Sequence, residues 1–393
     1  MQNKKTKMTI KQLSLIIPVL AVVLFLAVPW VKAIEVGDIP QQVEDTHLTE
    51  PENIDLDPWV EDLEIPWQLT FLPDSDRALV TERPGRIRLI ENGELQDDVY
   101  AFIDTDHYGE GGLMGLTHHP DFPDQPYIYI MYTYQDDTGE HFNRVSRLTD
   151  QGQEAADEEI LIDHIPAARN HNGGRLRFGP DDKLYITTGD TWERQKSQDP
   201  ENLAGKILRA DAEGSIPEDN PRADSYVYSL GHRNPQGLAW NEQGHLFISD
   251  HGPSGESGLQ AKDMIKVIQP GGNYGWPEQI GYFEDSEFLN PLIMWADAAV
   301  PPSGAHFVDG DLFVATLRSR ALVKISLEHS SGYDYRVTGI EHWFSESPYS
   351  GIFGRLRDVT ADREGNLYVL TSNRDGRGEP RPGDDRIYKI ELD

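Results

Sequence analysis

A pattern of alternating apolar and polar positions recurs six times along this chain. Each copy contains a short apolar stretch, a turn rich in Asp, Pro or Gly, and a second stretch of the Leu-aromatic-Val/Ile type. Two such stretches on either side of a turn are typical of a β-hairpin. The six copies begin at the following residues: Trp67, Gly115, Arg175, Gly237, Gly304 and Arg357.

The spacing of these hairpins predicts the fold. They recur about every 50–65 residues, and no convincing amphipathic helix separates them. Repeated four-stranded units at such a period are typical of a β-propeller, in which each blade buries its faces against its neighbours. We therefore expect an all-β, six-bladed β-propeller over residues 60–393. A seven-bladed ring and an unrelated all-β fold are the alternatives. In a propeller, loops at one mouth of the central channel carry the chemistry.

The first 33 residues predict export. Lysines at positions 4, 5, 7 and 11 precede an uncharged apolar run from Leu13 to Val31, and Ala33 follows shortly after. This order is typical of a secretory signal peptide, and the run is also long enough for an uncleaved membrane anchor. Both interpretations place the remaining chain in the periplasm or outside the cell. Residues 34–59 are expected to be an acidic linker or N-terminal extension.

Charge and cysteine content exclude several classes of protein. The chain has 35 Lys and Arg against 67 Asp and Glu, a net charge of −32. Such a surface repels nucleic acid and anionic lipid, so we expect no nucleic-acid partner and no membrane contact except through residues 13–31. The chain has no cysteine. Disulfides, thiolate metal sites and a cysteine nucleophile are therefore excluded.

The loop around His171 contains the candidate general base. Asn and Gly flank this histidine in the segment RNHNGGR, where the ring is able to reach a substrate. Asp190 lies one hairpin further along the chain. A carboxylate in that position would orient the imidazole and stabilise its charged form. A purely structural His–Asp pair is the alternative.

Two arginine-containing segments are suited to an anion. Arg233, Asn234 and Gln236 share one loop and offer several hydrogen-bond donors to a carboxylate-rich or quinone ligand. Arg355 and Arg357 are two residues apart on an expected strand, so both side chains would point to the same face. Ion pairs with surface carboxylates are the alternative in a chain this acidic.

The turn at Gly252 and Pro253 is suited to a cation. It exposes backbone carbonyl oxygens, which are ligands that Ca²⁺ accepts. By itself the segment is only a turn. Together with the candidate base and the arginines, it predicts one site for a polyanionic cofactor and a metal ion.

These motifs resemble those of the soluble, pyrroloquinoline quinone (PQQ)-dependent glucose and aldose sugar dehydrogenases, over nearly all of the chain after residue 60. The segments GHRNPQGLA, EGSIPEDNP and GGNYGWP, at residues 231–239, 213–221 and 271–277, are close to family-specific. The resemblance is closer to the broad-specificity aldose sugar dehydrogenases. It implies oxidation of an aldose to its lactone with PQQ and Ca²⁺ as cofactors. The electrons would pass to an acceptor such as a quinone or a periplasmic cytochrome.

The resemblance also implies catalytic and cofactor-binding roles. His171 would take the proton of the anomeric hydroxyl while hydride passes to PQQ, with Asp190 as the partner of the histidine. Arg233 would lie beside the reactive quinone. The other residues that would contact PQQ are these: Asn234, Gln236, Arg318, Arg355 and Arg357.

Metal-binding and substrate-binding roles follow in the same way. Gly252 and Pro253 would hold Ca²⁺ through their carbonyl oxygens, and Glu110 and Asn170 would contact the sugar. Two alternatives remain at this point. A Ca²⁺-dependent propeller lactonase would need side-chain carboxylates and Asn around the channel axis. A non-catalytic propeller would bind a protein or glycan without a cofactor.

Overall fold

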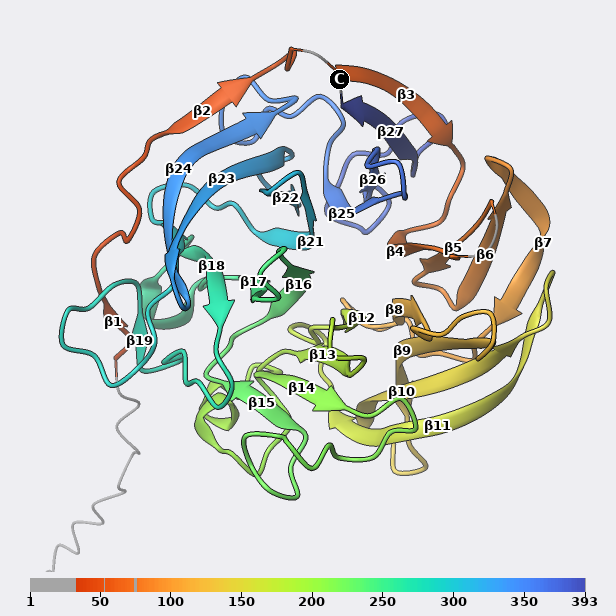
Figure 1. Cartoon of the computed structure of the whole chain (residues 1–393), viewed down its shortest axis with the longest axis horizontal. Helices are drawn as coiled ribbons and strands as arrows, with labels where there is room; N and C mark the ends of the chain where they lie inside the picture. Colours follow the sequence, from red (N-terminus) through yellow and green to blue (C-terminus); the bar gives the residue numbers. More distant parts are fainter. Residues whose placement is uncertain (1–32, 53, 74–75, 393) are drawn as a thin grey trace, which may run out of the picture. The chain divides into compact units, whose positions relative to one another are not determined.

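The six predicted hairpins are the two inner strands of six β-sheets arranged around a central axis (Figure 1). The structure is a computed structural model, which describes residues 33–52, 54–73 and 76–392. The prediction of a six-bladed β-propeller is confirmed, and the seven-bladed alternative is wrong. The predicted apolar export segment at residues 13–31 lies outside the described residues.

The strands of the first four blades follow one another in chain order from the axis outwards. The first blade contains β4 (Pro66–Phe71), β5 (Arg77–Glu82), β6 (Arg86–Glu91) and β7 (Glu94–Phe102). The second contains β8 (Leu113–His118), β9 (Tyr127–Gln135), β10 (His141–Asp150) and β11 (Ala155–Pro166). The third contains β12 (Leu176–Phe178), β13 (Leu184–Thr188), β14 (Lys206–Ala210) and β15 (Val227–Leu230). The fourth contains β16 (Pro235–Trp240), β17 (Leu246–Asp250), β18 (Asp263–Ile268) and β20 (Ile293–Trp295).

The N-terminal segment completes the last two blades. The fifth blade contains β21 (Pro302–Val308), β22 (Asp311–Thr316), β23 (Leu322–Ser331) and β24 (Asp334–Trp343), with β2 (Asp45–Leu48) added in parallel to β24. The sixth blade contains β25 (Leu356–Ala361), β26 (Leu367–Thr371), β27 (Ile387–Leu392) and β3 (Ile54–Val60). Strand β3 pairs antiparallel to β27, so an early segment and the end of the chain close the ring together.

This closure corrects the predicted role of residues 34–59. The segment was expected to be a linker or an N-terminal extension because it is acidic and contains proline. Instead β3 is the outermost strand of the sixth blade, where its side chains alternate between half-buried and exposed positions. An outer strand tolerates Pro58 and acidic side chains because its free edge and outer face meet solvent. Strand β1 (Glu35–Val36) pairs in parallel with β19 (Gln279–Ile280).

The inner strands are buried on both faces because blades pack face to face. All five residues of β13 and of β26 are buried, as expected for strands covered on both sides. One core cluster joins Tyr129 and Val145 of the second blade to Ile186 and Leu208 of the third. Each fully buried apolar side chain of this kind contributes roughly 1.5–3 kcal/mol to folding. The packed blades give the loops a rigid base.

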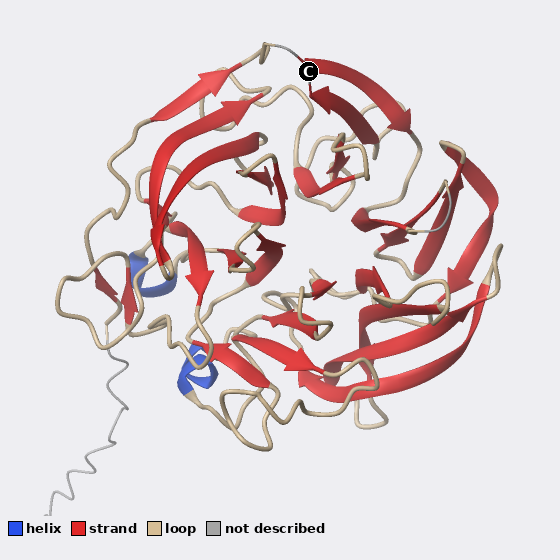
Figure 2. Ribbon diagram, in the orientation of Figure 1, coloured by secondary structure: helices blue, strands red, loops and turns tan. Residues whose placement is uncertain are grey.

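Helical structure is minor in the part of the chain that the structure describes (Figure 2). It consists of two short 3₁₀ turns, η1 (Arg194–Gln198) and η2 (Glu256–Gly258). Over the same residues, no helix reaches the length and apolar character needed to cross a membrane.

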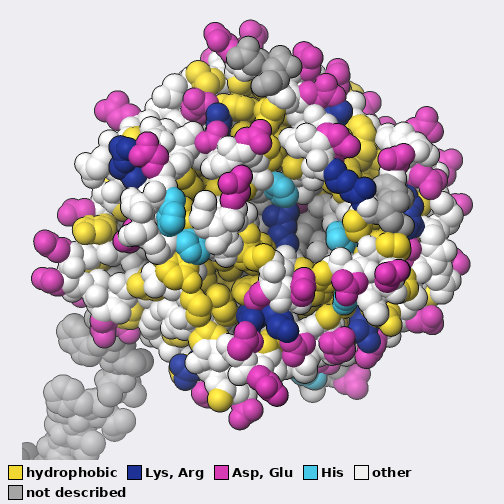
Figure 3. Space-filling view, in the orientation of Figure 1, with side chains coloured by type: hydrophobic (Ala, Val, Ile, Leu, Met, Phe, Trp, Pro, Cys, Tyr) yellow, Lys and Arg dark blue, Asp and Glu magenta, His cyan; other side chains and the backbone are white. Residues whose placement is uncertain are grey.

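Acidic side chains surround the propeller face shown in Figure 3, as the net charge of −32 leads one to expect. The centre of this face is hollowed, and Lys or Arg side chains lie within the hollow. Basic groups are therefore present along the axis of an acidic molecule.

Candidate active site

Loops from all six blades meet around a cavity of about 540 Å³ at one end of the channel. Its charged lining is mainly basic, since five arginines and a single carboxylate contribute to it. The lining residues are the following: Glu110, His171, Arg233, His251, Ser254, Pro301, Leu317, Arg318, Arg320, Tyr349, Arg355 and Arg377. The structure thus brings five of the predicted site residues to one cavity, from segments far apart in the sequence.

His171 and Asp190 form a buried pair at the edge of this cavity. His171 Nδ1 lies 2.6 Å from Asp190 Oδ1, and the two side chains are 6% and 1% exposed. A carboxylate acceptor requires Nδ1 to carry the proton, which leaves Nε2 as a free acceptor in a neutral imidazole. Because His171 lines the cavity, this geometry suits a base that accepts a proton from a bound hydroxyl group.

Two tryptophans that were not predicted as site residues contact the His171–Asp190 pair. The indole N–H of Trp276 donates to Asp190 Oδ2 at 2.8 Å, so both carboxylate oxygens are used. Trp192 donates its backbone N–H to Asp190 Oδ1 at 3.0 Å and stacks its ring on His171. The motif GGNYGWP contains Trp276, so its position in a recognisable motif was a usable signal. No sequence signal distinguished Trp192.

Glu110 and Asn170 lie beside His171, on the side predicted to meet the substrate. Glu110 accepts the His171 backbone N–H at 3.0 Å and the Asn170 side-chain amide at 2.8 Å, and Arg377 Nη1 lies 2.6 Å from Glu110 Oε1. Burial opposes ionisation of Glu110, but the Arg377 guanidinium, His171 and these hydrogen bonds outweigh it. They hold the pKa of Glu110 well below its usual range. Arg377 was missed because it lies in the β26–β27 loop, outside every motif.

Arg355 and Arg357 converge on one carboxylate, although not for the predicted reason. Arg355 precedes β25, and Arg357 lies at a register shift in that strand, so strand periodicity does not align them. Both guanidinium groups instead approach Asp375 Oδ2, at 2.8 Å and 3.9 Å. Burial, opposed by Asp375 and reinforced by neighbouring arginines, lowers the pKa of Arg357 to about 9. An added anion beside these two groups would be favourable.

Asn234 and Gln236 lie behind the cavity wall. Asn234 donates its backbone N–H to Asp250 Oδ1 at 2.8 Å and accepts the Gly173 N–H at 3.0 Å. Gln236 Oε1 accepts Arg357 Nη1 at 2.8 Å. Neither residue lines the cavity, so in this structure they hold the loops of His171 and Arg357 in place.

Arg233 and Arg318 occupy different parts of the wall. Arg233 is 1% exposed, pairs with Glu256 at 2.6 Å and lies over the Trp276 ring. The Arg318 guanidinium is exposed and lies 5.1 Å from the centre of the Tyr349 ring. Arg233 is thus a fixed cation in the wall of the site, whereas Arg318 has, among the described residues, only the Tyr349 ring as a partner.

Gly252 and Pro253 line a smaller cavity of about 160 Å³, which shares four lining residues with the larger one: His251, Ser254, Pro301 and Arg318. Their carbonyl oxygens accept no hydrogen bond from any described residue. Within the described ranges, no group of three or more His, Cys, Asp or Glu side chains could hold a metal ion. Asp263 is the one carboxylate in the lining of the smaller cavity, and its two oxygens accept the backbone N–H groups of Gly252 and Val300. A Ca²⁺ here would therefore depend mainly on backbone oxygens and on the cofactor itself.

Buried donors in the wall of the larger cavity and directly behind it fit PQQ. Arg357 Nε and His251 Nε2 are buried and have no hydrogen-bond partner among the described residues. Buried donors normally have partners, so these groups suit a ligand rich in carboxylate and carbonyl oxygens. The lining residues that would hold such a ligand are Arg233, His251, Arg318 and Arg355. Arg357 does not line the cavity but approaches the same Asp375 oxygen as Arg355, and its free Nε would add a donor.

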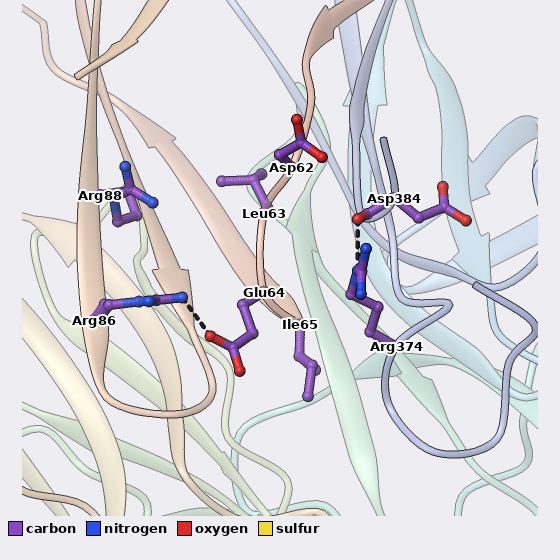
Figure 4. A pocket seen from close by; sticks show the side chains of 8 residues that line it. All are labelled: Asp62, Leu63, Glu64, Ile65, Arg86, Arg88, Arg374 and Asp384. Carbon is purple, nitrogen blue, oxygen red and sulfur yellow. Dashed lines mark hydrogen bonds and ion pairs between the residues drawn. The ribbon is translucent and has the colours of Figure 1, made fainter. Parts of the chain in front are cut away.

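A cavity of about 520 Å³ between the first and sixth blades differs in character (Figure 4). Its arginines already have partners within the protein: Arg86 pairs with the Glu64 carboxylate at 2.6 Å, and Arg374 donates to the backbone carbonyl of Asp384 at 2.6 Å. With three arginines against three carboxylates, this cavity has no excess positive charge. It contains neither a candidate base nor any predicted site residue.

Comparison with known proteins identifies the family of the chain and agrees with the fold. The sequence pattern of the Glucose / Sorbosone dehydrogenase family matches residues 63–380. The chain therefore belongs to this family of oxidoreductases, and the predicted resemblance is confirmed. Aldose sugar dehydrogenase YliI of Escherichia coli K12 is 30% identical over 358 residues, which cover 83% of this chain and 92% of the relative.

Two solved structures are similar over almost their whole length. An oxidoreductase of Thermus thermophilus, assigned as a glucose dehydrogenase, is 45% identical with a TM-score of 0.79, covering 86% of this chain and all of the other. The PQQ-bound aldose sugar dehydrogenase of Streptomyces coelicolor is 33% identical with a TM-score of 0.75. This second similarity covers 87% of this chain and 99% of the other.

Proposed function

We propose that this protein oxidises aldoses at the anomeric carbon to lactones, with PQQ and Ca²⁺ as cofactors. The observation that carries the proposal is one cavity lined by five arginines and by His171, whose Nδ1 is held by the buried Asp190 behind it. Relatives with the same fold are named as aldose sugar dehydrogenases, and one is PQQ-bound.

The protein's own residues would bind the cofactor and move one proton. PQQ, when bound, supplies the hydride acceptor. Arg233, Arg355 and Arg357 would neutralise its carboxylates, and the Gly252 and Pro253 carbonyls would hold Ca²⁺ beside it. These groups fix the ligand in place before the sugar enters.

His171 Nε2 would accept the proton of the anomeric hydroxyl group. Asp190 keeps the ring in the correct tautomer and stabilises the imidazolium that forms. Glu110 and Asn170, which hydrogen-bond each other next to His171, would orient the sugar hydroxyls. Because Arg377 keeps Glu110 ionised, that carboxylate acts as a hydrogen-bond acceptor and not as a second acid.

The decisive experiment is a titration of the purified protein, lacking residues 1–33, with PQQ and Ca²⁺, followed by aldose-dependent reduction of an artificial dye. We expect one PQQ per chain and dye reduction that requires both additions. Arg357→Gln should weaken PQQ uptake, whereas Arg86→Gln, at the other cavity, should not. Calcium binding without PQQ uptake would contradict the proposal and favour a lactonase or a binding module.

The same proposal includes export and an electron acceptor. The basic and apolar N-terminal sequence supports a location in the periplasm or outside the cell. A quinone or a periplasmic cytochrome would then receive the electrons. Cell fractionation tests the location, and activity in the cytoplasmic fraction alone would contradict it.

A further inference from the structure

Trp192 is an exposed tryptophan in contact with the proposed base. Its ring lies 4.6 Å from the His171 ring, centre to centre, at an interplanar angle of 21°. Yet 52% of the residue is exposed, more than any other tryptophan among the described residues. An exposed indole gains little from burial, so core packing does not explain its presence.

The backbone holds this indole in an unusual conformation. Thr191 and Trp192 both have positive φ angles, 53° and 64°. This region is disfavoured for bulky and β-branched residues, and such conformations cluster at functional sites. The Trp192 N–H donates to Asp190 Oδ1, the same oxygen that accepts His171 Nδ1. The turn is therefore built on the His–Asp pair itself.

The second tryptophan of the site shows the contrast. Trp276 is fully buried, and its indole N–H is used by Asp190. Trp192 makes its one ring contact, within the described chain, with His171. Trp192 also does not line the cavity, so its effect would have to pass through the imidazole.

We propose that Trp192 is a positioning residue whose aromatic face stabilises the imidazolium that His171 forms during the reaction. The inference rests on the proposed function, because it takes His171 as the base. In that step the hydroxyl proton passes to His171 Nε2, the hydrogen on the anomeric carbon leaves with its electron pair to the bound quinone, and that carbon becomes a carbonyl. A cation beside an indole face is attracted to it, whereas a neutral imidazole is held less strongly. The stacking therefore favours the charged form that follows proton transfer.

Other charged groups also act on His171. Asp190 accepts its Nδ1 proton, Glu110 accepts its backbone N–H, and Arg377 pairs with Glu110. Arg233, Arg355 and the neighbouring His251 share the cavity wall. A substitution at Trp192 leaves all of these groups in place. Variants that differ only at position 192 therefore measure the effect of the indole ring on His171 separately from the effect of these charges.

The first test is spectroscopic and needs neither cofactor nor sugar. A protonated imidazole quenches the fluorescence of an indole stacked on it, so wild-type emission should fall as His171 is protonated. Trp192→Phe and His171→Gln should each remove this pH-dependent change. Tyr282→Leu, an exposed aromatic on another part of the propeller, should retain it. Identical titrations of wild type and Trp192→Phe would overturn the stacking.

The second test is kinetic, on the enzyme loaded with PQQ and Ca²⁺. Trp192→Leu keeps an apolar cover on His171 but removes the aromatic face. We expect kcat to fall roughly 3- to 10-fold with little change in KM. The acidic limb of the pH profile should move to lower pH by about 0.4 to 1.5 units, and Trp192→Phe should restore part of both effects.

The outcomes separate this inference from the proposed function. Equal losses in Trp192→Leu and Trp192→Phe, with an unmoved pH profile, would show a merely structural role. A protein that oxidises no aldose but shows the Trp192-dependent fluorescence titration would contradict the proposed function and leave the stacking intact.

Discussion

Replacing Asp190 by Asn tests the central pair most directly. The carboxylate accepts three hydrogen bonds: from His171 Nδ1 at 2.6 Å, from the Trp192 backbone at 3.0 Å and from the Trp276 indole at 2.8 Å. All three partners are donors. An asparagine has one acceptor oxygen, and its amide group would face at least one of these donors. The substitution therefore removes a charge and disturbs the tautomer of His171.

The size of the expected fall in kcat follows from the burial of the His171–Asp190 pair. Two unit charges ~4 Å apart interact by about 4 kcal/mol at an effective dielectric constant of 20. That value applies because Asp190 is 1% exposed, so water screens the pair little. The amide dipole recovers part of the loss, so we expect roughly 3 kcal/mol less stabilisation of the transition state. This corresponds to a fall in kcat of about 10²- to 10³-fold.

The assay is steady-state dye reduction with saturating aldose, together with a PQQ titration of the same preparation. PQQ uptake should be unchanged, because Asp190 does not line the cavity. Asp199→Asn provides the control, since it makes the same chemical change on a nearby loop. Among the described residues, the Asp199 carboxylate accepts a hydrogen bond only from the backbone N–H of Glu201. A kcat for Asp190→Asn within about threefold of wild type would refute the assigned role of the pair.

Three further predictions concern positioning and stability. Trp276→Phe removes one hydrogen bond to Asp190 and should lower kcat about 3- to 10-fold at unchanged KM, measured in the same assay. Asp358→Asn removes the counter-charge of Arg175, which lies 2.8 Å away and is equally buried. This substitution should lower the free energy of unfolding, measured with urea, by about 3–5 kcal/mol. Burial lowers the pKa of Lys206 to about 7, so the folded state releases a proton that the unfolded chain keeps until about pH 10. The stability of wild type relative to Lys206→Met should therefore rise from pH 7 to 10, and a flat difference would contradict the shift.

The inner hairpins could be predicted from sequence, but the outer closure could not. A hairpin is local: its turn residues and its alternation lie within one short segment, as in the copy that begins at Gly237. Strand β3 pairs with β27, so Ile54 lies opposite Leu392. Nothing in the segment IDLDPWV specifies that partner, and its acids and proline are equally compatible with a linker.

The site shows the same division between local and distant information. Sequence motifs identified His171, Arg233 and Arg355, because each lies in a distinctive loop that reaches the cavity. Arg320 and Arg377 were missed because they join the site only through the arrangement of the blades. Asn234 and Gln236 belong to a recognisable motif, but the register shift at Pro235–Gly237 turns this segment toward other loops. A sequence motif therefore identifies the loop that contributes to the site, whereas packing between the blades determines the direction of each side chain.

The pairing of β3 with β27 also determines when the molecule is able to finish folding. Residues 54–60 leave the ribosome before any strand of the first five blades except β2, but their partner at 387–392 is made after all of those strands. Until then, β3 has no strand to pair with, and the sixth blade has not formed. Shortened chains that lack β27 would keep the ring open and expose strand edges that attract other chains. The ring therefore closes only in molecules whose synthesis has continued through β27.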